Sequence, residues 1–402
     1  MKILMVNKFL YSRGGCENYM LYLAEHLTKL GHEIEFFGMY DENNTVGNSV
    51  GLYTQNMDFH SKGVARFLYP FKIIYSFEAK KKIMQVIDDF QPDIVHMNNI
   101  NFQLTPSMIY GIKKKGIPVV QTVHDYQMIC PNHLLYNFDK NEICEKCLKG
   151  AYMGCIKNKC IHDSRVKSII GAIEARLYSL LGTYKKVDLY ISPSYFLEQK
   201  LLSAKKLYKG KTKTIHNFIN KEQFSCQESN YENYIAFAGR LSKEKGVELL
   251  AETAKLLPEY TFMVAGDGPD KHLLENIENV KLVGFLSGQK LIDFIAKAKV
   301  LAVPSIWYEN CPLSILEAQC MGVPVITMNH GGMAELIEDG VTGILVKEST
   351  PQEFAAGLQR ALASDEYCNS LRENCKNARE QILSVEEYAK ILMEEYKKLM
   401  KR

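Results

Sequence analysis

The sequence lacks any long hydrophobic run. No stretch of about 18 consecutive apolar residues occurs in its 402 residues, so we expect no membrane-spanning helix. The first apolar run, residues 2–6, is too short for a secretory leader and is followed at once by Asn7 and Lys8. We therefore expect a cytoplasmic protein, with the inner face of the membrane as an alternative location.

A strong excess of charge is also missing. The net charge is +3 at pH 7, which gives little reason to expect a nucleic-acid partner. The 11 cysteines are an odd number, and in a reducing compartment they favour free thiols or metal ligands over disulfides. The length exceeds one ordinary core, so two domains are expected.

Short apolar runs alternate with helical patterns in both halves of the chain. We predict strands at residues 2–6, 33–37, 93–97, 117–123, 188–192, 213–216, 234–238, 261–265, 280–283, 299–303, 323–327 and 344–346. Two such series predict an α/β protein with two doubly wound, Rossmann-like sheets that face a central cleft. The expected domains are residues 1–217 and 232–380, and a final helix within 381–402 is expected to pack on the first domain.

The segment from Trp307 to Ala318 carries two carboxylates in a setting suited to a nucleotide sugar. Pro312 fits the first position of a helix, which places Glu309 in the preceding loop and Glu317 about two turns inside. A loop carboxylate beside exposed helix amides suits sugar hydroxyls and phosphate, and a second carboxylate suits a ribose diol. Two solvated glutamates on an amphipathic helix are the alternative.

Other phosphate-binding elements follow predicted strands. Arg240 and Lys245 lie after the first strand of the second half, where they would converge on a diphosphate; a solvated basic loop is the alternative. Glycine-rich turns, which allow close backbone approach, occur at Gly14-Gly15, Gly266-Asp267-Gly268 and Asn329-His330-Gly331-Gly332. None is a G-x-G-x-x-G dinucleotide fingerprint, and an ordinary turn explains Gly14-Gly15 equally well.

Two histidines are predicted at strand ends. His124, with Asp125 beside it, is the better candidate for contact with a sugar or for acid–base work, and His96 is the weaker one.

Four cysteines, Cys144, Cys147, Cys155 and Cys160, have the paired spacing of a tetrahedral structural zinc site in an insertion at about residues 130–162. An iron–sulfur cluster is the alternative metal group, and unliganded surface thiols are a third interpretation. Cys130 lies near enough in the sequence to replace one of the four ligands.

Residues 64–83 mix aromatic side chains with Arg66, Lys72 and Lys80, Lys81 and Lys82. This segment fits peripheral contact with an anionic membrane or a lipid-linked acceptor, although a core helix with a solvated basic face explains it as well.

Taken together, these residues resemble glycosyltransferase family 4, a large retaining family with the GT-B fold. The motifs that carry the resemblance are Gly14-Gly15-x-Glu17, Thr122-Val123-His124-Asp125, Gly239-Arg240 with Lys245, Gly266-Asp267-Gly268-Pro269, Glu309 to Glu317, and Gly331-Gly332 with Glu335. The cysteine pairs after Cys130-Pro131 look like one subgroup. Many relatives carry Glu-Gly-Phe-Gly where this chain has Glu309-Asn310-Cys311-Pro312, which leaves the donor sugar open.

The resemblance implies a role for each matching residue. Arg240 and Lys245 would bind the donor diphosphate, Glu309 the sugar, and His124 the sugar near its reacting carbon. Donor-binding positions carried over from the family are Gly14, Gly15, Gly266, Gly268, Asn310, Cys311, Pro312, Leu313 and Glu317.

The implied reaction is retaining transfer from a nucleotide-sugar donor to a glycan or lipid-linked acceptor in bacterial surface polysaccharide synthesis. Front-face attack is expected, with no catalytic divalent cation, since Arg240, Lys245 and helix amides stabilise the leaving phosphate. Glu309 is the alternative as a nucleophile. Competing classes are a GT-B epimerase or phosphorylase, for which no pyridoxal-binding lysine is evident, and a non-catalytic nucleotide-sugar or nucleic-acid binder.

Overall fold

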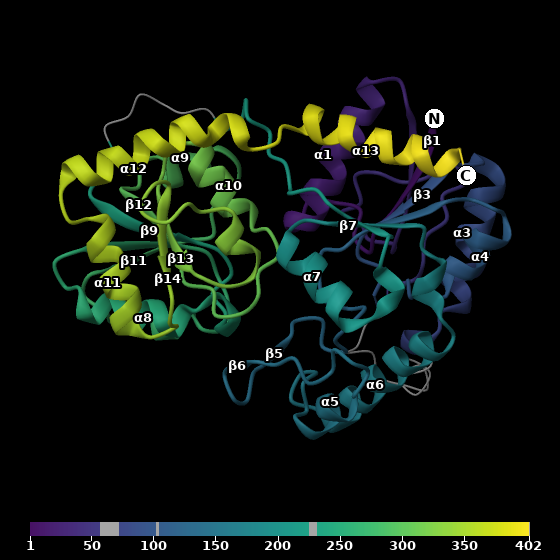
Figure 1. The fold of residues 1–402 in the computed structure, drawn as a ribbon, viewed down its shortest axis with the longest axis horizontal. Coiled ribbons are helices and arrows are strands. Elements are labelled where there is room, and N and C mark those ends of the chain that lie inside the picture. Colours follow the sequence, from purple (N-terminus) through teal and green to yellow (C-terminus); the bar gives the residue numbers. More distant parts are fainter. Residues whose placement is uncertain (57–71, 102–103, 225–230, 402) are drawn as a thin grey trace. The chain divides into compact units, whose positions relative to one another are not determined.

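A computed structural model describes residues 1–56, 72–101, 104–224 and 231–401. The chain divides into two compact units (Figure 1). Unit 1 comprises Met1–Asp139, Cys144–His216 and Val385–Arg402, and unit 2 comprises Lys140–Ile143 and Asn217–Ser384. Each unit contains one six-stranded sheet, and all the strand pairs recorded within these two sheets are parallel.

The sheet of unit 1 has the strand order β2-β1-β3-β4-β7-β8. Its strands are β1 (Lys2–Val6), β2 (Glu33–Phe37), β3 (Ile94–Met97), β4 (Val119–Thr122), β7 (Leu189–Ser192) and β8 (Thr212–Thr214). The helices are α1 (Gly15–Lys29), α3 (Phe77–Phe90), α4 (Met108–Lys114), α5 (Met153–Lys157), α6 (Arg165–Leu180), α7 (Tyr195–Ala204) and α13 (Val385–Met400). Short strands β5 (Tyr136–Asn137) and β6 (Glu142–Ile143), with α5 and α6, occupy the insertion between β4 and β7.

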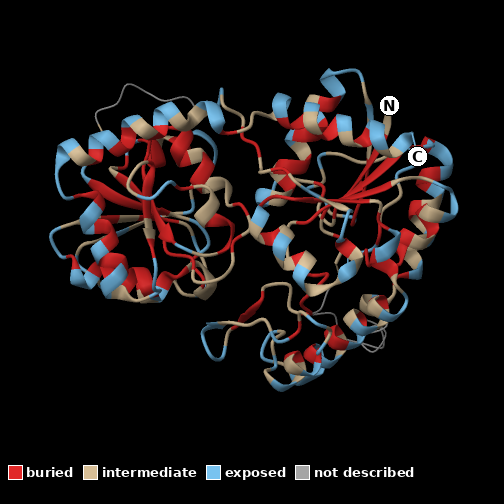
Figure 2. Cartoon of the chain, viewed as in Figure 1, coloured by how far each residue is buried: buried red, intermediate tan, exposed pale blue. Residues whose placement is uncertain are grey.

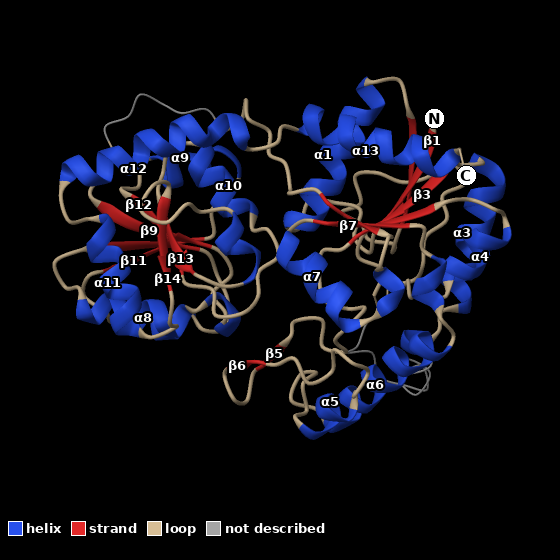
Figure 3. Cartoon of the chain, viewed as in Figure 1, coloured by secondary structure: helices blue, strands red, loops and turns tan. Residues whose placement is uncertain are grey.

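The sheet of unit 2 has the order β11-β10-β9-β12-β13-β14. Its strands are β9 (Tyr234–Ala238), β10 (Thr261–Ala265), β11 (Val280–Gly284), β12 (Val300–Val303), β13 (Val325–Met328) and β14 (Gly343–Val346). The helices are α8 (Val247–Leu256), α9 (Gly288–Ala296), α10 (Leu313–Cys320), α11 (Pro351–Ala361) and α12 (Asp365–Ala378) (Figure 3).

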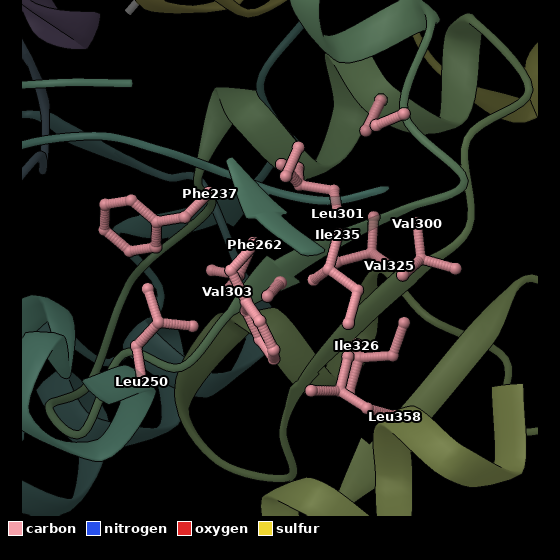
Figure 4. Packing of buried hydrophobic residues seen from close by; sticks show 14 of the residues in the cluster. Ile235, Phe237, Leu250, Phe262, Val300, Leu301, Val303, Val325, Ile326 and Leu358 are labelled. Atoms are coloured by element: carbon pink, nitrogen blue, oxygen red, sulfur yellow. The ribbon is translucent and has the colours of Figure 1, made fainter. Parts of the chain in front are cut away.

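The central strands are buried on both faces, which explains their continuously apolar sequences. Every residue of β3, β4, β7, β12 and β13 is buried, as the interior of a parallel sheet covered by helices requires. Figure 4 shows the resulting core of unit 2, where Ile235, Phe262 and Ile326 from the sheet pack with Leu250 of α8 and Leu358 of α11. The predicted α/β class with two doubly wound sheets is confirmed.

In both sheets, the strand order changes direction at the first strand. In unit 1 the chain adds β2 on one side of β1 and β3 on the other, and in unit 2 it adds β10 and β12 on opposite sides of β9. Such a reversal opens a crevice at the carboxyl ends of the two adjacent strands, where doubly wound proteins bind their ligands.

Candidate active site

In unit 2, Lys245 and Glu309 meet at this edge of the sheet, one from the loop after β9 and the other from the loop after β12. Glu309 is buried, with 7% of its surface exposed. Its Oε1 accepts hydrogen bonds from Lys245 Nζ, from Ser305 Oγ at 3.1 Å and from Trp307 Nε1 at 2.9 Å. Three donors on one oxygen fix the carboxylate, and Oε2 takes no part in these bonds.

A tight backbone contact holds the two loops together. Gly246 has a φ of +74°, and a Cβ there would lie 2.0 Å from the carbonyl oxygen of Pro304. The amide of Ile306 donates to the carbonyl of Glu244 at 3.1 Å. Only glycine allows this approach without strain, so Gly246 positions Lys245 against Glu309.

A third loop, after β13, closes against Glu309. The amide of Gly332 donates to the Glu309 carbonyl at 2.7 Å, and a Cβ at Gly331 would lie 2.7 Å from the same oxygen. His330 Nε2 lies 3.1 Å from the Ser305 carbonyl oxygen. The predicted Asn329-His330-Gly331-Gly332 turn therefore supports the carboxylate loop.

The turn after β10 fixes the backbone around Arg240. A Cβ at Gly266 would lie 1.8 Å from the Gly239 carbonyl oxygen, and one at Gly268 would lie 2.2 Å from that of Leu241. The amide of Leu241 donates to the carbonyl of Asp267 at 2.9 Å. Arg240 is exposed. These contacts fix its backbone, while its guanidinium reaches solvent.

The helix that follows Glu309 begins one residue later than predicted. Pro312 caps α10 with an extended ψ of 123°, and Leu313 is the first helical residue. Glu317 lies on α10 as predicted. It is half-buried, and burial raises the pKa of its carboxyl to about 7.

Asn310 and Cys311 occupy the turn before α10. The Cys311 side chain packs with Ile219, Leu316, Cys320 and Ile382, and its carbonyl accepts from Asn217 Nδ2 at 2.9 Å. Burial raises the pKa of its thiol to about 12. The Cys311 side chain therefore packs within an apolar cluster. This packing explains why position 311 has an apolar side chain rather than a charged one.

In unit 1, Gly14 and Gly15 lie at the start of α1. Gly14 is the N-terminal cap, with extended backbone, and Gly15 is the first helical residue. Glu17 is buried in the first turn and accepts from Asn7 Nδ2 at 3.2 Å. The amino end of α1 thus lies beside the carboxyl end of β1, as the sequence predicts.

His124 lies beyond the end of β4 and contacts Asn98, which follows β3. His124 Nε2 is 2.9 Å from Asn98 Oδ1, and its ring packs edge-on against Tyr19 with a centroid separation of 5.0 Å. Burial lowers the pKa of His124 to about 3, so the ring is neutral near pH 7. Asn98 is buried, and its Nδ2 has no hydrogen-bond partner among the described residues. A buried donor without a protein partner is able to donate to a water or to a ligand oxygen.

His96 was predicted at a strand end, and this was wrong: it lies inside β3 and is fully buried. Its Nδ1 contacts the Tyr396 hydroxyl, and its Nε2 lies 2.7 Å from Thr122 Oγ1. Thr122 Oγ1 lies 3.1 Å from the Tyr19 hydroxyl, which is 2.7 Å from that of Tyr388. Because Tyr388 and Tyr396 belong to α13, His96 is part of a buried network that ties the last helix to the sheet.

A second group of ionisable side chains lies near Asp125. Asp125 Oδ1 accepts from the amide of Gln127 at 2.8 Å, and Oδ2 is 3.7 Å from His133 Nδ1. Glu174 of α6 is buried, and burial together with the charge of Asp125 raises its pKa to about 8. A pKa of about 8 favours the protonated form of the Glu174 carboxyl near pH 7.

Three of the four predicted zinc ligands gather in one cluster. Cys147, Cys155 and Cys160 pack together with Tyr152 and Ala172. A hydrogen bond with Cys160 raises the pKa of the Cys155 thiol well above its usual value. However, in the described parts of the chain no set of three or more His, Cys, Asp or Glu residues is arranged to hold a metal ion. The structure gives the zinc site no support, so it stays a prediction for metal analysis of the purified protein.

Several residues of these two sites escaped sequence reasoning. Ser305 and Trp307 were not singled out as partners of Glu309, nor Asn98 and Tyr19 as partners of His124. The only available signal was position, since Asn98 and Ser305 each follow the end of a predicted strand.

Most of the segment predicted to contact a membrane, residues 64–83, lies outside the described residues, because these exclude 57–71. In its described part, Lys82 donates to the Tyr53 carbonyl and pairs with Glu78 at 2.8 Å. Among the helices that the structure describes, none combines the length and the apolar character needed to span a bilayer.

Comparison with solved structures defines the class of the fold. A sucrose-phosphate synthase from Thermosynechococcus elongatus matches 99% of this chain and 98% of its own with a TM-score of 0.74 at 17% identity. Anabaena HepE, solved in complex with UDP, matches 99% of this chain and all of its own with a TM-score of 0.70 at 17% identity. The fold is therefore that of a GT-B glycosyltransferase.

Sequence comparison narrows this class. Residues 13–223 match the profile described as Glycosyltransferase Family 4, and residues 218–378 match that of Glycosyl transferases group 1. An uncharacterized 42.6 kDa protein in the cps region of Klebsiella pneumoniae is 27% identical over 84% of this chain and 87% of its own. A GDP-mannose-dependent alpha-mannosyltransferase of Corynebacterium glutamicum is 35% identical over 32% of each chain. The chain belongs to glycosyltransferase family 4, as the motifs predicted.

Proposed function

We propose that this glycosyltransferase transfers a sugar, with retention of configuration, from a nucleotide-sugar donor bound by unit 2 to a glycan or lipid-linked acceptor of a bacterial surface polysaccharide. The observation that carries the proposal is the ion pair of Lys245 and Glu309 at the carboxyl ends of the adjacent strands β9 and β12. The similarity to a protein of a cps region supports the polysaccharide assignment.

Donor binding follows from the charges in unit 2. The exposed guanidinium of Arg240 and the ammonium of Lys245 bind the diphosphate, which competes with Glu309 for Lys245. Glu309 Oε2 accepts from hydroxyls of the transferred sugar. The Glu317 side chain forms no recorded hydrogen bond or ion pair with the described residues, so its carboxylate is available to the ribose diol. The amino end of α10 adds amides for a phosphate oxygen.

The reaction then depends on charge stabilisation. As the bond between sugar and diphosphate breaks, negative charge grows on the leaving phosphate, and the preorganised cations stabilise it. In unit 1, we expect His124 and the Asn98 Nδ2 donor to bind oxygens of a sugar. Since Arg240 and Lys245 supply the positive charge, we expect transfer to continue after divalent ions are removed with EDTA.

Thermal-shift measurements against UDP-, GDP- and ADP-sugars test the donor assignment. One donor should raise the melting temperature. Arg240→Ala and Glu317→Gln should abolish that shift, whereas the exposed controls Lys290→Ala and Glu278→Ala should keep it. If no nucleotide sugar stabilises the protein, or if Arg240→Ala keeps the full shift, the proposed donor site is wrong.

A further inference from the structure

The outward face of α6 is apolar, although it lies against solvent. Val166, Ile169, Ile173 and Leu180 are 66%, 38%, 49% and 69% exposed. The residues that α6 buries are Ser168, Gly171, Ala172, Glu174 and Tyr178. Four large aliphatic side chains thus face outward, although an ordinary surface helix covers such residues. Apart from Tyr178, the residues that α6 buries are small or polar, and Ile170 and Leu177 are half-buried. Figure 2 shows both classes of burial along this helix.

These four aliphatic residues form one stripe. At 100° per residue they fall within an arc of about 60°, and Arg165 and Arg176 lie along one margin of that arc. The stripe continues into Leu181, which is 49% exposed, and α5, which packs against α6, adds the exposed Met153. We call this set, with the two arginines, the α6 surface.

The charges around the α6 surface are mainly positive. Arg165, Lys167 and Arg176 are exposed, and none of them forms an ion pair within the described chain. The only acidic residue of α6, Glu174, is buried and lies outside the stripe, about 110° around the helix from its middle. Asp163, just before the helix, lies 3.5 Å from Lys159. The surface therefore combines exposed aliphatic area with unneutralised arginines.

Two partners could cover the α6 surface, namely a second copy of the chain or a membrane, and the charges distinguish between them. A second copy of the chain would bring an equally basic surface against this one, so like charges would oppose the contact. An anionic bilayer offers acyl chains to the aliphatic stripe and phosphate groups to the arginines. We propose that the α6 surface docks this protein on a membrane that contains anionic lipid, with α6 lying in the plane of the headgroups. This interaction surface goes beyond the proposed function and does not depend on the donor site.

Vesicle co-sedimentation of the full chain tests the docking surface. The protein should sediment with phosphatidylcholine vesicles that contain phosphatidylglycerol, and much less with pure phosphatidylcholine. The double variant Ile169→Ser/Ile173→Ser should weaken binding about tenfold or more, because it removes apolar area at the centre of the stripe. Arg165→Glu/Arg176→Glu should weaken it similarly, and the wild-type protein should bind less in 0.5 M salt.

Matched controls alter exposed residues far from α6 in the sequence. Leu256→Ser, at a site 47% exposed, and Lys290→Glu should bind vesicles like the wild type. Circular dichroism and the donor thermal shift should be unchanged in every variant, so loss of binding is separated from loss of fold or of the donor site. Equal sedimentation with neutral and anionic vesicles, or α6 variants that bind like the wild type, would overturn the proposal. So would a wild-type dimer in ultracentrifugation that the α6 variants dissociate, because the surface would then join copies of the chain.

Discussion

At the scale of single residues, the ion pair of Lys245 and Glu309 is unequally exposed. The Glu309 side chain is 10% exposed and that of Lys245 is 31% exposed. Removal of the lysine leaves a nearly buried carboxylate without its cation. We expect Lys245→Ala to lower the free energy of unfolding by about 1–2 kcal/mol, below the cost of a fully buried pair because Lys245 reaches solvent. Urea unfolding measures this change.

A double variant separates the effect of the unpaired Glu309 charge from the effect of losing the Lys245 side chain. In Lys245→Ala/Glu309→Gln, the amide oxygen still accepts from Ser305 and Trp307, so part of the lost stability should return. Lys255→Ala breaks the exposed pair with Glu252 and should change stability by about 0.5 kcal/mol or less. If the double variant is no more stable than Lys245→Ala, an unpaired charge on Glu309 is not the cause of the loss.

Glu317 predicts a particular pH dependence of stability. Its pKa is raised to about 7 in the folded protein, so its contribution to stability is complete below the unfolded pKa and is lost as the pH rises through 7. Glu317→Gln removes this titration. The stability of the variant relative to the wild type should therefore rise between pH 5 and pH 8, by at most about 3 kcal/mol and by less to the extent that Glu317 reaches solvent. Unfolding curves at several pH values measure the difference, and a constant difference would contradict it.

The sequence predicted the positions of site residues that belong to motifs with a fixed spacing. It did not predict which side chains they contact. Glu309, Arg240 and the glycine turns lie in the expected loops, and Glu317 lies in the expected helix, because strand ends, helix starts and turn residues are local signals. Asn98 meets His124 from a different loop, which only the folded sheet brings near it. Trp307 lies only two residues from Glu309, but its spacing does not show that the ring nitrogen faces the carboxylate. The burial of His96 also depended on contacts with α13, distant in the chain.

At the scale of elements, the close contact at Gly246 makes the loop after β9 depend on one glycine. Gly246→Ala places a Cβ against the Pro304 carbonyl and also strains a positive φ. We expect a loss of about 2 kcal/mol or more, together with loss of the donor thermal shift, because Lys245 is displaced. Calorimetry with and without donor measures both effects.

Gly284 provides the matched control. Its φ is +77°, but a Cβ there meets no atom within 4 Å. Gly284→Ala should therefore cost only the backbone strain, about 1 kcal/mol, and keep the donor shift. Equal behaviour of the two variants would show that the contact with Pro304 has no effect on the site.

The network beneath α13 predicts an effect of the last helix on catalysis. Tyr388→Phe removes the hydroxyl bonded to that of Tyr19, whose ring packs against His124. We expect unit 1 to lose about 1–2 kcal/mol of stability and kcat to fall more than KM changes, because His124 loses its support. Tyr367→Phe, which removes a weaker bond to the Gly340 carbonyl in unit 2, is the control. If Tyr388→Phe lowers stability but leaves kcat unchanged, the network has only a structural role.

Strand bounds were predicted closely where a strand is a short apolar run. The predicted 2–6, 33–37, 234–238 and 261–265 match β1, β2, β9 and β10 at both ends. The face of α6 was not foreseen, since its apolar residues have the spacing of a core stripe and only contacts of the folded chain show which side is covered. The start of α10 differs by one residue because Pro312 fits both the cap and the first turn.

At the scale of the whole molecule, the final helix belongs to the unit in which the chain began. Tyr388, Leu392 and Tyr396 are at most 1% exposed, within unit 1. Deletion of residues 385–402 should therefore lower the melting temperature of unit 1 and leave that of unit 2 nearly unchanged. Calorimetry with limited proteolysis assigns each transition, and a truncated chain that melts like the full one would contradict the division.

The same arrangement has a consequence for biosynthesis. The residues of α13 are translated after those of unit 2, so the rest of unit 1 stays without this helix until unit 2 has been synthesised. During that interval the apolar side chains of α1 that α13 covers are open to chaperones and proteases. A premature stop codon between unit 2 and α13 would thus damage unit 1, although the other residues of that unit are synthesised before those of unit 2.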